Sequence, residues 1–253
     1  MIRKAFLGAL CASALTGSAF ATDLYNNTPG TGETVFTSGS SPRTSGADEA
    51  LFDGAGALIT DMQFGYSVAA GGPAAFDVRV RMFDDIDAVT TTGPQFLNQV
   101  ADFTLAFTGQ TAGAFITSTI NLTGLPGGGV SVTSNPTTLG VPNLTDVYVQ
   151  LSFYQTGTHT LVPANGVTFL FDGTGVNVGR TFADPLVGGD GTAATELYWR
   201  DANANDTITA DEARNFAAPN RANFVLRLGG TIVPEPTTLL GLGLAGLAFL
   251  RRR

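Results

Sequence analysis

Residues 147–154 read Val-Tyr-Val-Gln-Leu-Ser-Phe-Tyr, and this stretch indicates the fold class more clearly than any other. Its first, third, fifth and seventh residues are apolar, and each residue between them carries a hydroxyl or an amide. Successive side chains of a β-strand point to opposite faces, so a period of two places the apolar set on one face. The stretch therefore predicts a half-buried strand.

The same alternation recurs along the chain. Residues 75–83 repeat it, with Arg79 and Arg81 on the polar face. Further strands are predicted at 33–37, 57–68, 103–107, 116–122, 167–171, 197–199 and 224–228. Gly-, Pro- and Asn-rich turns separate these segments, including a loop at 38–46, and helical periodicity is almost absent. This pattern predicts an all-β fold, a single antiparallel β-sandwich with a jelly-roll-like strand order as first choice and an immunoglobulin-like order as second.

The first 21 residues have the three parts of a signal peptide. In order, these parts are the basic pair Arg3 and Lys4, the apolar run 5–14 and the small residues Ala19 and Ala21 around Phe20. We expect cleavage after Ala21 and a mature chain that begins at Thr22.

Residues 233–253 form a tail with three ordered elements. These are Pro234-Glu235-Pro236, the apolar run 239–250, and the basic end Arg251-Arg252-Arg253. As a helix, the run would be about 18 Å long, which is shorter than the ~30 Å hydrocarbon core of a bilayer. Arginines that follow an apolar segment favour a cytoplasmic C-terminus and leave the preceding body outside.

This tail resembles the PEP-CTERM sorting signal of Gram-negative bacteria. The resemblance implies transient anchoring in the inner membrane through the C-terminal helix and recognition of Pro234-Glu235-Pro236 by an exosortase-type membrane enzyme. It also implies that the protein reaches the cell surface or the extracellular space after processing. The chain thus divides into a signal peptide (1–21), a β-sandwich body (22–232) and a sorting tail (233–253).

The composition of the body excludes several functions. Residues 22–232 contain no Lys and no Cys, and eight arginines against twenty acidic residues give a net charge of −12. So acidic a surface repels nucleic acid and anionic membranes. Without a disulfide, a hydrophobic core, alone or with a metal, must hold the exported body together.

The residues that carry chemistry are few. His159 is the only histidine, which excludes a multi-histidine zinc site, and the body has no thiol nucleophile and no Schiff-base lysine. We therefore expect a protein without catalytic residues. The runner-up is a polysaccharide-degrading or carbohydrate-binding sandwich, since a glycoside hydrolase needs only two carboxylates and sugars stack on exposed rings. Its candidates are the acids Asp84, Asp85, Asp87 and Glu196 and the rings Tyr148, Tyr154, Tyr198 and Trp199.

Residues 201–212 resemble the twelve-residue calcium loop of EF-hands and dockerins. The oxygen ligands that this likeness implies are Asp201, Asn203, Asn205, Thr207, Thr209 and Glu212. Asp206 stands where the pattern has glycine, although Asp tolerates the left-handed backbone of that position better than most residues. The sequence leaves two readings open, a weak Ca²⁺ site and an acidic loop that binds nothing. Thr209 and Glu212 also fit a capping box, which predicts a short helix to about Ala218.

These features predict an exported, exosortase-processed, non-enzymatic protein. We expect it to have a structural or adhesive role at the cell surface or in extracellular polysaccharide, with that polysaccharide as a possible partner.

Overall fold

The computed structural model describes the body of the chain in twelve segments. They are residues 22–29, 35–37, 45–87, 95–113, 115–133, 144–163, 166–172, 178, 195–201, 205–208, 213–217 and 223–233. The predicted signal peptide, the Pro-Glu-Pro motif, the apolar run and the arginine cluster lie outside them. The described residues contain no α-helix, and one 3-10 turn, η1 (Pro126–Gly128), leads into β8.

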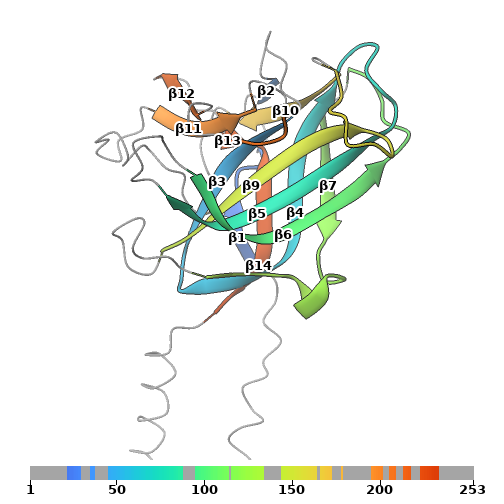
Figure 1. The fold of residues 1–253 in the computed structure, drawn as a ribbon. Coiled ribbons are helices and arrows are strands. Elements are labelled where there is room, and N and C mark those ends of the chain that lie inside the picture. The colour runs from blue at the N-terminus through green and yellow to red at the C-terminus, as the bar shows by residue number, and fades with distance from the viewer. Residues whose placement is uncertain are drawn as a thin grey trace, which may run out of the picture.

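The first sheet has eight strands (Figure 1). They are β1 (Thr22–Asn26), β2 (Val35–Thr37), β4 (Gly56–Val68), β7 (Phe115–Asn121), β8 (Val130–Thr133), β10 (Val167–Asp172), β13 (Asn223–Phe224) and β14 (Leu226–Ile232). The long β4 is its centre, because β14 and β10 pair along one edge of β4 and β8 and β7 pair along the other. β1 then pairs with the free edge of β14.

The second sheet has six strands in the order β12-β11-β3-β9-β5-β6. They are β3 (Ser45–Asp53), β5 (Phe76–Asp87), β6 (Gln95–Phe107), β9 (Leu144–Gln155), β11 (Thr195–Arg200) and β12 (Ala213–Ala217). Every pairing in both sheets is antiparallel.

The two sheets are wound together as a jelly roll. Along the chain, the eight strands of the winding are β2, β3, β4, β5, β6, β7, β9 and β10. They pair first with last (β2–β10), second with seventh (β3–β9), third with sixth (β4–β7) and fourth with fifth (β5–β6). This nested pairing is the jelly-roll order, which confirms the first choice of topology over the immunoglobulin-like one.

Aromatic side chains join the sheets. The ring of Tyr66 on β4 lies 5.5 Å from that of Phe76 on β5, and Phe153 on β9 lies 5.0 Å from Phe169 on β10. All four side chains are at most 1% exposed. A fully buried side chain of this size stabilises a fold by about 1.5–3 kcal/mol, so these inter-sheet contacts help to hold together a body without disulfides.

The observed strands correct the sequence prediction in four places. β1 and β8 were not predicted, and β3 covers residues 45–53, of which the sequence placed 45 and 46 in a loop and predicted no strand. The predicted helix from Glu212 to about Ala218 is wrong, because residues 213–217 form β12 and pair with β11 from Trp199↔Ala213 to Thr195↔Ala217. A capping box contributes only about 1 kcal/mol to a short helix, and a complete row of backbone hydrogen bonds to a neighbouring strand outweighs it.

Candidate functional site

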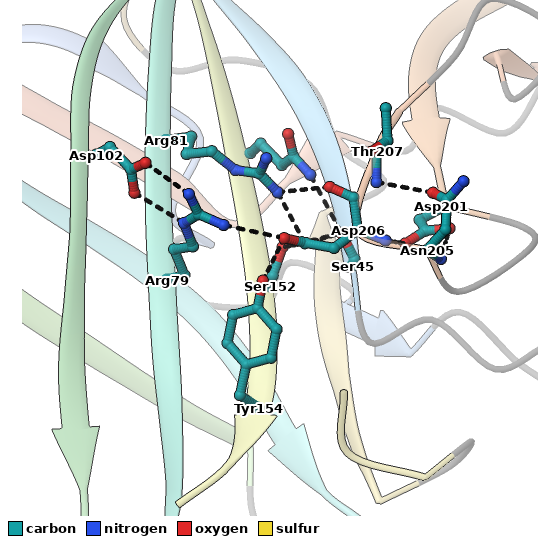
Figure 2. A network of polar contacts seen from close by, with 11 residues as sticks. Ser45, Arg79, Arg81, Asp102, Ser152, Tyr154, Asp201, Asn205, Asp206 and Thr207 are labelled. Carbon is teal, nitrogen blue, oxygen red and sulfur yellow. Dashed lines mark hydrogen bonds and ion pairs between the residues drawn. The ribbon is translucent and has the colours of Figure 1, made fainter. Parts of the chain in front are cut away.

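A network of polar side chains on the outer face of the second sheet surrounds Asp206 (Figure 2). Asp206 lies in the described loop segment 205–208, between β11 and β12. Its carboxylate is 2.7 Å from Nη2 of Arg81 and 3.2 Å from Nη1 of Arg79, both on β5. From β9, Ser152 donates to it at 2.6 Å, and the Tyr154 hydroxyl donates as well. One acidic side chain therefore joins the loop to two adjacent strands.

The backbone of the loop is shaped to direct Asp206 inward. Asp206 has φ = 62°, the left-handed conformation in which the calcium-loop pattern has glycine. The carboxylate of Asp201 accepts the N–H groups of Asn205 at 3.1 Å and Asp206 at 2.6 Å, and Asn205 Oδ1 accepts the N–H of Thr207 at 2.8 Å. Asp201 is only 4% exposed, and its own N–H donates to Ser45 O on β3. The loop is thus a closed turn fastened to the sheet.

The charges of the network are arranged in a row. Arg79 lies between Asp206 and Asp102 of β6, and its Nη2 is 2.6 Å from Asp102 Oδ2. Hydrogen bonding to Arg79 lowers the pKa of Asp102. Burial, and then the hydrogen bond to Asp206, raise the pKa of Tyr154, so its phenol remains protonated and donates to the carboxylate. The row thus places Arg79 between two acids and Arg81 beside Asp206.

Three of the six predicted calcium ligands, Asp201, Asn205 and Thr207, lie in the described loop. The other three, Asn203, Thr209 and Glu212, lie outside the described residues. Among the described residues there is no group of three or more His, Cys, Asp or Glu side chains placed to hold a metal ion. The calcium site therefore stays a prediction.

The candidate residues of the enzymatic and sugar-binding alternatives are engaged or buried where they are described. Asp84 is 3% exposed and accepts hydrogen bonds from Asn98 and from the N–H and hydroxyl of Thr133. It therefore joins β5 to β6 and β8. Tyr148 and Tyr154 are 1% and 2% exposed, so neither presents a ring face to solvent. The side chains of Asp85, Asp87, Glu196, Tyr198 and Trp199 lie outside the description.

His159 lies in an exposed turn after β9, with its ring 6.0 Å from that of Tyr154 in an edge-on contact.

Sequence reasoning missed the network itself. It placed Arg79 and Arg81 on the polar face of a strand, and it treated Asp206 as a departure from the calcium-loop pattern. That departure was a usable signal. An acid in place of glycine has a strained backbone, and contacts of its carboxylate must offset the cost of that strain.

The described residues include no helix with the length and apolar character needed to cross a bilayer. The predicted membrane helix at 239–250 falls outside them, as do the predicted cleavage residues Ala19 and Ala21.

Comparison with protein families finds a PEP-CTERM protein-sorting motif at residues 233–253. The chain carries an exosortase sorting signal. The match covers Pro234-Glu235-Pro236, the apolar run and the arginines 251–253, as the sequence predicted. The PEP-CTERM signal indicates export and processing by a membrane exosortase, which places the protein at the cell surface or outside the cell. Neither the search of curated proteins nor the search of solved structures found a match.

Proposed function

We propose that the exported body is a non-enzymatic protein with a structural or adhesive role in extracellular polysaccharide at the cell surface. The observation that carries this proposal is the outer face of β7. Every second residue of this strand points outward and is exposed, in the order Phe115, Thr117, Thr119 and Asn121. Phe115 is 60% exposed, the largest value among the exposed large apolar side chains of the described residues.

This row of side chains has the chemistry that sugars require. It is uncharged in a body of net charge −12. A phenyl ring offers an apolar face to the C–H groups of a sugar, and hydroxyl and amide groups both donate to and accept from sugar hydroxyls. A strand of this kind can follow a polysaccharide chain along its length.

The engagement of the described carboxylates supports the non-enzymatic part of the proposal. Asp84 and Asp206 each accept hydrogen bonds from two or more side chains of the protein, and Asp102 accepts two from Arg79. A general acid or base must reach a substrate proton with a free oxygen. These three acids instead hold strands and a loop together.

The test is co-sedimentation of the secreted protein with extracellular polysaccharide purified from the producing cells. We expect Phe115→Ala to weaken binding by about tenfold, which corresponds to one lost ring contact. The matched control is His159→Ala, which removes an exposed ring at another place and should bind like the wild type. Equal binding by the wild type and Phe115→Ala would reject the β7 surface. Release of new reducing ends from the polysaccharide would instead favour the degrading enzyme.

We also propose that residues 201–212 bind one Ca²⁺ weakly, through Asp201, Asn203, Asn205, Thr207, Thr209 and Glu212. Two observations support this proposal: the pairing Trp199↔Ala213 brings the two ends of the loop together, and Asp206 adopts the turn that the pattern needs. We expect a dissociation constant of roughly 10⁻⁴–10⁻³ M. A free Ca²⁺ concentration ten times that constant would stabilise the body by ~1.4 kcal/mol.

Melting curves of the secreted protein in calcium and in chelator test this second proposal. We expect Glu212→Gln to remove most of the shift and Asp211→Asn, which removes a neighbouring charge that is not a proposed ligand, to retain it. Identical curves for the wild type under the two conditions would leave the segment as an acidic loop.

A further inference from the structure

The end of β14 lies beside the turn between β3 and β4, which contains two glycines. Gly54 and Gly56 have φ values of 138° and 142°, which other residues rarely adopt. A Cβ on Gly54 would lie 2.6 Å from Cγ2 of Ile232, and a Cβ on Gly56 would lie 2.7 Å from Val132 O. The absence of a side chain on Gly54 therefore lets Ile232 lie against this turn.

Val233, the residue before Pro234-Glu235-Pro236, is fixed at the same turn. The N–H of Val233 donates to Gly56 O at 2.9 Å, and Thr145 Oγ1 donates to Gly54 O at 2.9 Å. The end of β14 is thus attached to the sheet up to Val233, and the chain leaves the sandwich at one defined point.

This exit point is apolar and open to solvent. Ile232 is 47% exposed and Val233 is 48% exposed, and they are two of the four exposed large apolar residues in the described part of the chain. We call Gly54, Gly56, Ile232 and Val233 the tail-proximal patch. Two adjacent exposed β-branched residues at an ordered strand end are available for contact with a partner.

The length of the tail brings this patch close to the membrane. Only residues 234–238 separate Val233 from the apolar run that begins at Leu239. Five residues span at most about 17 Å when fully extended. While the tail is inserted, an enzyme that binds Pro234-Glu235-Pro236 must therefore lie against the patch.

We propose that the tail-proximal patch is a docking surface for the membrane processing enzyme, in addition to the sorting motif. Ile232 and Val233 pack against an apolar surface on the outer side of that enzyme. The contact orients the motif for processing, because Val233 is held by the sheet and Pro234 follows it directly.

Two other occupants fit less well. The lipid surface is disfavoured because a body of net charge −12 is repelled by anionic headgroups. A second copy of the chain is disfavoured because two side chains offer far less than the ~600–800 Å² per partner that a stable dimer buries.

The experiment follows processing of the full-length chain in producing cells, as the decay of the tail-bearing form after a pulse of label. We expect Ile232→Ser combined with Val233→Ser to slow processing on the order of tenfold, the usual result of losing apolar contacts between an enzyme and its substrate. The control Val178→Ser removes an exposed apolar residue beside Asn26, at the end of β1 that lies away from Ile232, and should leave the rate unchanged. Protease resistance of the body in each variant checks that it folds.

A second variant leaves the body unaltered. Ten Gly-Ser residues inserted between Val233 and Pro234 separate the patch from the motif, and docking predicts slower processing. A faster rate after insertion would mean that the sandwich obstructs the enzyme, and an unchanged rate in both variants would mean that the motif alone is read. Either result would overturn the proposal. Neither depends on polysaccharide binding.

Discussion

The two outer faces of the sandwich each carry a cluster of arginine and aspartate, and the clusters are built in opposite ways. On the second sheet, one acid, Asp206, contacts two arginines, and the side chains are 13–28% exposed. On the first sheet, one arginine, Arg227, lies 2.6 Å from both Asp23 and Asp61, with side chains 23–31% exposed. The same residue types thus serve two different connections.

The clusters differ in whether the segments that they join are also connected through backbone hydrogen bonds. Arg227, Asp23 and Asp61 lie on β14, β1 and β4, which are already paired through their backbones. The segment 205–208 belongs to no described strand, so the side chain of Asp206 is its main described attachment to β5 and β9. We therefore expect an ion pair between strands that are already paired to add little stability. An ion pair that attaches an otherwise unpaired segment should add much more.

The largest effect should follow from Asp206→Ala. The change removes the partner of two partly buried arginines and places alanine at φ = 62°. We expect a loss of about 2–3 kcal/mol in the free energy of unfolding by urea, below the 3–5 kcal/mol of a fully buried pair because water reaches these side chains.

Asp206→Gly separates the two causes, because glycine satisfies the left-handed backbone and leaves the arginines unpaired. It should be nearly as unstable as Asp206→Ala. If Asp206→Gly unfolds like the wild type, the backbone conformation alone determines the residue at this position, and the comparison of the two clusters fails.

A smaller effect should follow from Arg227→Ala. Its ion pairs are exposed to solvent and the strands remain paired, so we expect a loss of about 0.5–1 kcal/mol. The same urea titration measures it, and 0.5 M NaCl should reduce the difference from the wild type. A loss as large as that of Asp206→Ala would show that backbone pairing does not make this cluster dispensable.

The smallest effect concerns pH and the outer end of the Asp206 row. Hydrogen bonding to Arg79 lowers the pKa of Asp102 in the folded state. A lowered pKa adds stability above the unfolded value of about 3.9, and that stability is lost as the pH falls through the folded value. Asp102→Asn should therefore be slightly less stable than the wild type at pH 7, and the difference should disappear in acid, as the pH falls through the lowered pKa of Asp102. A difference that persists there would assign it to packing.

The sequence predicted most clearly the strand segments whose inward residues are apolar. Over residues 76–82 of β5 and 147–153 of β9 the alternation is clean for this reason. In β3 it is not, because Asp48 points inward and accepts the N–H of Phe224, while Glu49 on the other face is also fully buried. A buried acid that serves as a backbone acceptor has no periodic signature in the sequence. That is why β3 was missed although it pairs with β9 over nine residues.

The assembly of the Asp206 network from distant segments could not have been predicted, for a related reason. It depends on the register that places Arg79 opposite Ser152 and Ser45 opposite Ser152, and on a loop that begins more than 120 residues after Arg81. Local patterns supplied the residues but not their meeting point. The sorting tail, by contrast, is read by an enzyme as a linear motif, so its sequence alone sufficed.

The antiparallel pairing of β1 with β14 determines how the body responds to a mechanical load. Thr22 lies opposite Gly230, so both ends of the body emerge on the same side (Figure 1). A pull between Thr22 and Val233 opens the pair from that side, one hydrogen bond after another. A pull from Val233 towards Phe115, at the opposite end of β4, draws β14 along its own axis, so that its bonds to β4 and β1 resist together. Under the proposed function, a body that binds polysaccharide on β7 while its tail is anchored is loaded in its stronger direction.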